Sequence, residues 1–120
     1  MRGFLTLAKA LGDESRVRAL LCVKDGELCL CQLIDVLGLS PATVSKHMNL
    51  LYQAGLVERR KEGKWHYYRM AGADAHPSVR RALDWVVAEL DRNPSIRDDV
   101  RRIREVRRKD LDELSACYRS

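Results

Sequence analysis

Residues 33–56 read LIDVLGLSPATVSKHMNLLYQAGL, and they contain two helical patterns separated by a short connection. Apolar residues recur every three or four positions up to Leu37, where Gly38 ends the first pattern. Ser40 and Pro41 open a second helix, because a hydroxyl at the N-cap and a proline at the first helical position are both favoured there. The connection between the two helices, residues 38–40, has the length that is typical of a helix-turn-helix. In such a unit the second helix enters the major groove of DNA.

Side chains that suit DNA occupy the outward positions at the start of the second helix. Hydroxyl and ammonium groups bind base edges and phosphates, and the free amides of a helix N-terminus attract a phosphate. The expected DNA contacts are Ser40, Thr43, Ser45, Lys46 and His47. The alternative is that they are ordinary polar residues facing solvent.

After Gly55 the periodicity changes from that of a helix to that of strands. Residues 56–60 and 64–70 predict two short strands joined by the glycine-containing turn 61–63. A basic hairpin beside a recognition helix is typical of a wing that grips the DNA backbone, although a charge run is more often a solvated face. The basic residues expected to bind DNA are Arg59, Arg60, Lys61 and Lys64.

Further helical patterns flank this unit. A first helix covers residues 4–11, Asp13 caps a second, and a third runs from about residue 28 to residue 37. Pro77 begins a fifth helix with an apolar stripe. The predicted fold is mainly α with a small β-hairpin, a winged helix-turn-helix.

The chain divides into two parts. Residues 1–92 are predicted to form the winged helix-turn-helix domain for DNA binding and dimerisation. Residues 93–120 are predicted to form a charged C-terminal helical tail, capped at Ser95, whose alternating charges make a salt-bridged, solvated face.

A homodimer on a palindromic site is expected, because one recognition helix makes too few contacts for tight specific binding. Apolar residues on the first and fifth helices are candidates for the subunit interface, and packing within one subunit is the alternative. These residues are Phe4, Leu5, Leu83, Val87 and Leu90.

Composition fits this interpretation. The 120 residues carry a net charge of +5, which favours a polyanionic partner. No apolar run approaches the roughly 18 residues of a membrane span, and the first residues lack a signal peptide. We therefore expect a cytoplasmic protein without membrane contact, whose four cysteines are free thiols or metal ligands.

Two of those cysteines, Cys29 and Cys31, are candidate metal ligands at the start of the third predicted helix. Thiolates select soft ions, and a helix N-terminus lowers thiol pKa. On an ideal helix, residues two apart point about 200° away from each other, so one ion would require the helix start to unwind. Ion binding would then be coupled to the DNA-reading unit. The alternative is a pair of buried core cysteines.

Taken together, these segments resemble the ArsR-type metalloregulators. The resemblance covers roughly residues 4–92 and is carried by AKALGDESR (8–16), ELCLCQL (27–33), SPATVSKH (40–47), GLV (55–57) and GKWHYYR (63–69). It implies a repressor that leaves its operator in double-stranded DNA when arsenite or antimonite, or another soft ion such as Cd(II) or Pb(II), binds the thiolates.

The sequence departs from the family's metal-binding segment at Ile34, where the family often has a third cysteine. Arsenite favours three sulfurs. The remaining candidates are Cys117, which we prefer weakly, and Cys22; a two-thiolate site is the third option.

The sequence leaves two other functions to consider. A winged-helix regulator without metal would sense thiol oxidation or a protein partner. A thiol enzyme would pair a cysteine with His47 or His66, but no glycine-rich elbow or carboxylate partner supports it. The chain is therefore predicted not to be an enzyme.

Overall fold

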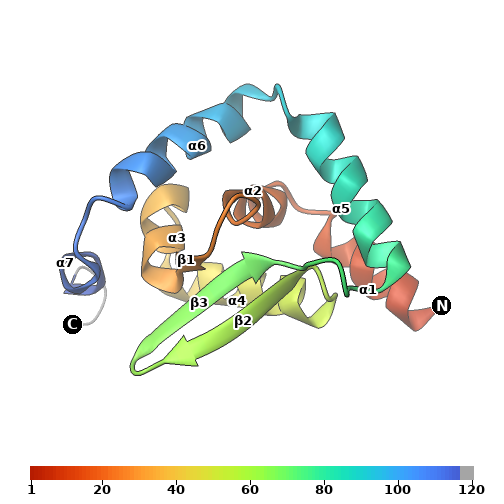
Figure 1. The fold of residues 1–120 in the computed structure, drawn as a ribbon, viewed down its shortest axis with the longest axis horizontal. Coiled ribbons are helices and arrows are strands. Elements are labelled where there is room, and N and C mark those ends of the chain that lie inside the picture. The colour runs from red at the N-terminus through yellow and green to blue at the C-terminus, as the bar shows by residue number, and fades with distance from the viewer. Residues whose placement is uncertain (117–120) are drawn as a thin grey trace.

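A computed structural model describes residues 1–116 of the chain, with seven helices and three strands in that range (Figure 1). In chain order they are α1 (Arg2–Ala10), α2 (Glu14–Cys22), β1 (Leu28–Cys29), α3 (Leu30–Leu37), α4 (Pro41–Gln53), β2 (Val57–Glu62), β3 (Trp65–Met70), α5 (Pro77–Leu90), α6 (Pro94–Val106) and α7 (Leu111–Ala116). The predicted winged helix-turn-helix is confirmed.

The helix-turn-helix forms as its local sequence predicts. Gly38 ends α3 in the left-handed region, at φ 67°, where glycine lacks the steric penalty of other residues. Ser40 caps α4 by accepting a hydrogen bond from the backbone N–H of Thr43, and Pro41 is the first helical residue. Val44 faces the core and is fully buried, whereas Thr43, Ser45 and Lys46 on the other side of α4 are exposed.

The predicted start of the third helix, at about residue 28, is wrong. Leu28 and Cys29 are extended and form β1, and α3 begins at Leu30. They pair antiparallel with Tyr68 and Tyr67 of β3, so the sheet has three strands in the order β1-β3-β2. The hairpin strand β2 is also longer than predicted, since it includes Lys61 and Glu62 and the turn begins at Gly63, at φ 59°.

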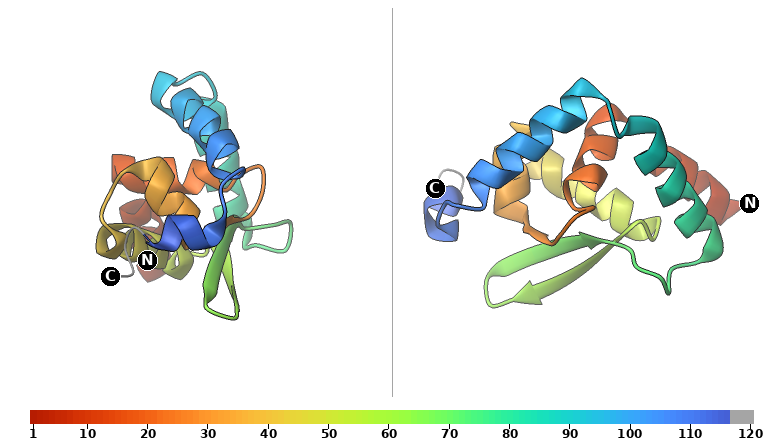
Figure 2. Two further views of the ribbon diagram at one scale, coloured as in Figure 1. Left: turned by 90° about the vertical axis from the view of Figure 1, so that its left-hand side faces the viewer. Right: turned by 45° about the horizontal axis from the view of Figure 1, so that its top comes forward.

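The C-terminal part packs onto the domain. Helix α6 contacts α2 and α3, and α7 contacts α3 (Figures 1 and 2). Val106 and Leu114 belong to the main core cluster. Asn93, rather than the predicted Ser95, caps α6, because its side-chain oxygen accepts from the N–H groups of Ser95 and Ile96.

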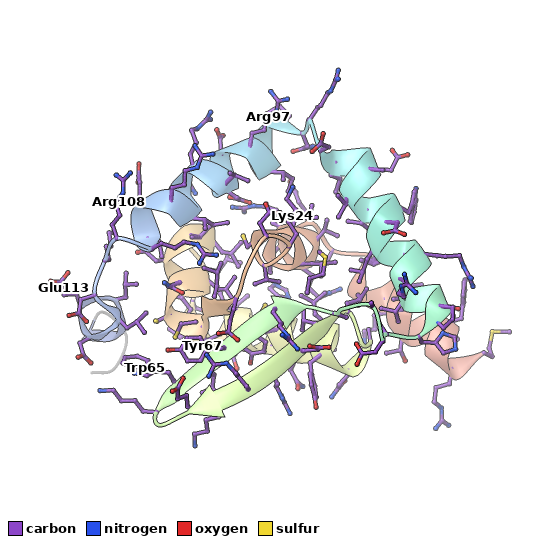
Figure 3. All side chains as sticks on the ribbon, in the orientation of Figure 1. Lys24, Trp65, Tyr67, Arg97, Arg108 and Glu113 are labelled. Atoms are coloured by element: carbon purple, nitrogen blue, oxygen red, sulfur yellow. The ribbon has the colours of Figure 1, made fainter. Side chains whose placement is uncertain are left out.

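The tail is only partly salt-bridged. Asp99 is 3% exposed and accepts two hydrogen bonds from Arg18 of α2, at 2.8 and 2.9 Å. Arg101 pairs with Asp98. Arg97 lies along the outer side of α6 and, within the described residues, makes no ion pair (Figure 3).

The apolar residues of α1 and α5 divide into two groups. Leu83 is 6% exposed and belongs to the main core, so its assignment to the subunit interface is corrected. Phe4 and Leu5 are 69% and 56% exposed. Val87 and Leu90 are half-buried against a smaller core cluster. None of the helices in the described range is long and apolar enough to cross a membrane.

Candidate thiolate site and nucleic-acid interface

Cys29 and Cys31 converge at the junction of β1 and α3. The Cys31 thiol donates a hydrogen bond to the Cys29 sulfur, and the two sulfurs are 3.0 Å apart. Both side chains are 1% exposed. The predicted 200° divergence is therefore wrong, because Cys29 is the extended N-cap residue of α3, at φ −72° and ψ 151°, and not part of the helix. The interpretation of both as buried is correct, yet the two sulfurs still face each other.

The same geometry gives the two thiols different pKa values. The hydrogen bond from Cys31 lowers the pKa of Cys29 to about 7, and backbone N–H groups at the start of α3 act in the same direction. That hydrogen bond raises the pKa of Cys31, because its proton is held by the neighbouring sulfur. Cys29 is therefore the first of the two thiols to ionise and Cys31 keeps its proton, and two sulfurs are a donor set that suits a soft ion.

In the part of the chain that the structure describes, no third ligand lies with them. Cys22 is buried in the core, and burial raises its pKa to about 12, so it behaves as an apolar core residue. Cys117 lies outside the described residues. Among the residues that are described, no three His, Cys, Asp or Glu side chains gather as a metal cluster.

An ion pair joins the residues just before Cys29 to the hairpin. Arg60 donates to both carboxylate oxygens of Glu27, at 2.7 and 2.8 Å, and lowers the pKa of that carboxyl. The guanidinium lies 4.3 Å from the centroid of the Tyr67 ring, and Tyr67 is paired with Cys29 across the sheet. Figure 3 shows Tyr67 and Trp65 on the part of the hairpin near α3 and α7.

Strand alternation divides the four basic residues predicted in the wing. Arg59 and Lys61 pair with Tyr68 and His66 of β3 and so share one face with them. Arg60 lies on the opposite face, where Glu27 and Glu62 engage it. Lys64, in the turn, pairs with Asp112 of α7 at 3.1 Å. The sequence grouped these cations, whereas the structure separates them.

The predicted residues of α4 lie on one exposed stretch. Ser40, Thr43, Ser45 and Lys46 are exposed. His47 is half-buried, with its ring 3.5 Å from the Arg16 guanidinium. The sequence interpretation missed Tyr52, whose ring lies 3.8 Å under Arg59, and it missed His66 as a partner of Lys61. The hairpin register was the signal that would have found His66.

An exposed helix beside a basic hairpin, on a helical core, defines a winged-helix DNA-binding regulator. A model of the arsR family of bacterial regulatory proteins matches residues 13–59. A solved structure from Mycobacterium bovis, the homodimeric winged helix-turn-helix DNA-binding domain of a possible ArsR-family regulator, is 33% identical with a TM-score of 0.61; the match covers 77% of this chain and 83% of that one. The chain belongs to the ArsR family.

Curated relatives include metal-resistance regulators. The arsenic resistance transcriptional regulator ArsR1 of Pseudomonas putida is 40% identical over 88 residues, 70% of this chain and 65% of that protein. The cadmium resistance regulatory protein CadC homolog of Staphylococcus aureus is 39% identical over 76 residues, 62% of this chain and 63% of that protein. The chain thus spans just under two thirds of these relatives. Relatives and fold are those of transcriptional regulators, not enzymes.

Proposed function

We propose that this chain is a repressor that leaves its operator when arsenite or antimonite binds Cys29 and Cys31. The observation that carries the proposal is the pair of sulfurs 3.0 Å apart at the first turn of α3, the helix that supports the recognition helix α4. Cd(II) and Pb(II) are alternative inducers, since they too prefer thiolates. Relatives named for arsenic and cadmium resistance support this range.

Binding of arsenite balances without a redox step. Each As–S bond replaces an As–OH group. At a protonated thiol the hydroxyl leaves as water with the proton of that thiol, and at a thiolate it leaves as hydroxide, which takes a proton from solvent. Of the two, Cys29 ionises first, and Cys31 reacts as the protonated thiol. Cys117 is our preferred third sulfur, and a two-sulfur site is the alternative.

Because both sulfurs are buried, an ion reaches them only when the junction of β1 and α3 opens. That movement displaces the first helix of the DNA-reading unit. By thermodynamic linkage, DNA must weaken ion binding by the same factor by which the ion weakens DNA binding.

The test is fluorescence anisotropy of the reduced chain on a labelled duplex selected from random sequence for binding to it. Arsenite should release the wild type and Cys22→Ser, and it should not release Cys29→Ser or Cys31→Ser. X-ray absorption then counts sulfurs around arsenic in the wild type and in Cys117→Ser. Release that persists in Cys29→Ser contradicts the proposal.

A second candidate function is thiol oxidation at the same pair, favoured by the thiolate character of Cys29. A peroxide would transfer one oxygen to the Cys29 thiolate, giving a sulfenic acid while the second oxygen leaves as hydroxide or water. DNA release by hydrogen peroxide, with mass spectrometry showing oxygen on Cys29 and no release by arsenite, would favour this function.

We also propose that the chain acts as a homodimer on a palindromic operator. Phe4 and Leu5 of α1 and Trp85 of α5 are large apolar residues that remain more than half exposed in one chain. Burial of such residues between two copies provides an interface, and the homodimeric relative from Mycobacterium bovis supports it.

A further inference from the structure

A hollow lies between the recognition helix α4 and the hairpin. Its lining residues are Leu30, Ser45, Arg59, Lys61, His66 and Tyr68. They come from three separate parts of the chain: the start of α3, the outer face of α4 and the paired strands β2 and β3.

The polar side chains that line the hollow are donors and cations, without a carboxylate among those described. Ser45, Arg59, Lys61 and His66 all carry hydrogen-bond donors, two of them permanently cationic, and no carboxylate is among the lining residues. On the other face of the hairpin the cations are already matched, because Glu27 and Glu62 pair with Arg60, and Glu58 pairs with Arg69. Among the described residues no carboxylate forms an ion pair with Arg59 or Lys61, so the hollow presents positive charge that the described part of the chain does not match.

The position of the hollow identifies what fits it. When α4 occupies the major groove and the hairpin tip reaches the adjacent minor groove, the sugar-phosphate strand that separates the two grooves passes between them. We infer that this hollow holds one phosphate of the operator backbone, bound by Arg59, Lys61 and His66 with Ser45. The inference rests on the proposed DNA-binding mode of α4 and assigns His66 a role in it.

The hollow also adjoins the thiolate site. Leu30, which forms part of its wall, is the single residue between Cys29 and Cys31. An ion bound by both sulfurs would replace the hydrogen bond that now joins them across Leu30. The wall of the proposed phosphate position thus includes the residue that lies between the two thiols.

The test uses the selected duplex without arsenite, so it does not depend on the inducer. Binding is measured by anisotropy against salt concentration for the wild type, Lys61→Gln and a matched control, Arg69→Gln. Both variants remove one exposed charge from the hairpin, but Arg69 lies on the face opposite the hollow. Lys61→Gln should lower the slope of log K against log salt by about one, whereas Arg69→Gln should leave it nearly unchanged.

A scan with neutral methylphosphonates locates the phosphate. One position in each half-site should weaken binding of the wild type and of Arg69→Gln, and should have a much smaller effect on Lys61→Gln and on His66→Ala. The inference is overturned if Lys61→Gln and Arg69→Gln lower the slope equally. It is also overturned if every phosphate has the same effect in all four proteins. Loss of all binding by Lys46→Ala together with an unchanged scan for Lys61→Gln would leave α4 as the DNA-binding helix and reject the hollow.

Discussion

Gln32 and Cys29 exchange hydrogen bonds at the start of α3. The side-chain oxygen of Gln32 accepts from the backbone N–H of Cys29 at 2.8 Å, and the Cys29 sulfur accepts from the backbone N–H of Gln32. This is a capping box in which a cysteine replaces the usual serine or threonine. The atom that would bind an ion is therefore the same atom that caps the helix.

Gln32→Ala tests this relationship. The substitution removes the acceptor of the Cys29 N–H, so the free energy of unfolding should fall by about 1 kcal/mol in urea denaturation. Because the ion-free arrangement is then less stable, half-maximal release from DNA should require less arsenite. Gln32→Glu keeps the acceptor and should retain most of the free energy of unfolding that Gln32→Ala loses. Equal behaviour of the two variants would contradict the capping role.

Cys31→Ala should raise the pKa of Cys29, since the hydrogen bond that favours the thiolate is lost. In the wild type, thiolate absorbance should titrate with a midpoint near pH 7, and in the variant the midpoint should move toward 9. The sign for stability follows from the lowered folded-state pKa. The contribution of Cys29 to the free energy of unfolding is fully present above pH 9, where the thiol is ionised in the unfolded chain too. This contribution is lost as pH falls through 7. A midpoint that stays near 7 in Cys31→Ala would contradict this origin.

The sequence predicted the elements whose signals are local. The Ser40-Pro41 start of α4 and the Asp13 cap of α2 each depend on a few neighbouring residues, and both are confirmed. Strand β1 was missed because two residues carry no periodicity of their own. Their extended conformation depends on β3, whose paired residues Tyr67 and Tyr68 lie about forty positions later.

That single omission changed the predicted site. With Cys29 placed in a helix, the two thiols diverge, and with Cys29 in β1 they meet. The interface prediction failed at Leu83 for a different reason. Helical periodicity identifies an apolar face, but it does not say whether the same chain or a partner covers that face.

Arg18→Met should be strongly destabilising. It leaves the Asp99 carboxylate buried without its partner, and removal of one member of a buried ion pair costs about 3 kcal/mol. Thermal or urea denaturation gives the loss. The double variant Arg18→Met with Asp99→Leu should recover most of it, because no buried charge remains. A single variant as stable as the wild type would show that the pair does not hold α6 on α2.

Phe4→Glu and Leu83→Ala should affect different properties. Phe4 is exposed in one chain, so the glutamate should convert the dimer to a monomer in light scattering and weaken operator binding at least tenfold. Leu83 lies in the core, so its truncation should cost about 2–4 kcal/mol of folding stability. A dimeric Phe4→Glu chain would reject the proposed interface.

The order β1-β3-β2 makes β2 an edge strand, whose outer backbone groups have no strand partner among the described residues. An exposed edge strand can pair with another copy of the chain, and such pairing leads to aggregation. Here residues 58–62 are five consecutive charged side chains, Glu-Arg-Arg-Lys-Glu. Two copies that paired edge to edge would have to desolvate these charges, so the hairpin that we expect to contact DNA also discourages aggregation of the chain at high concentration.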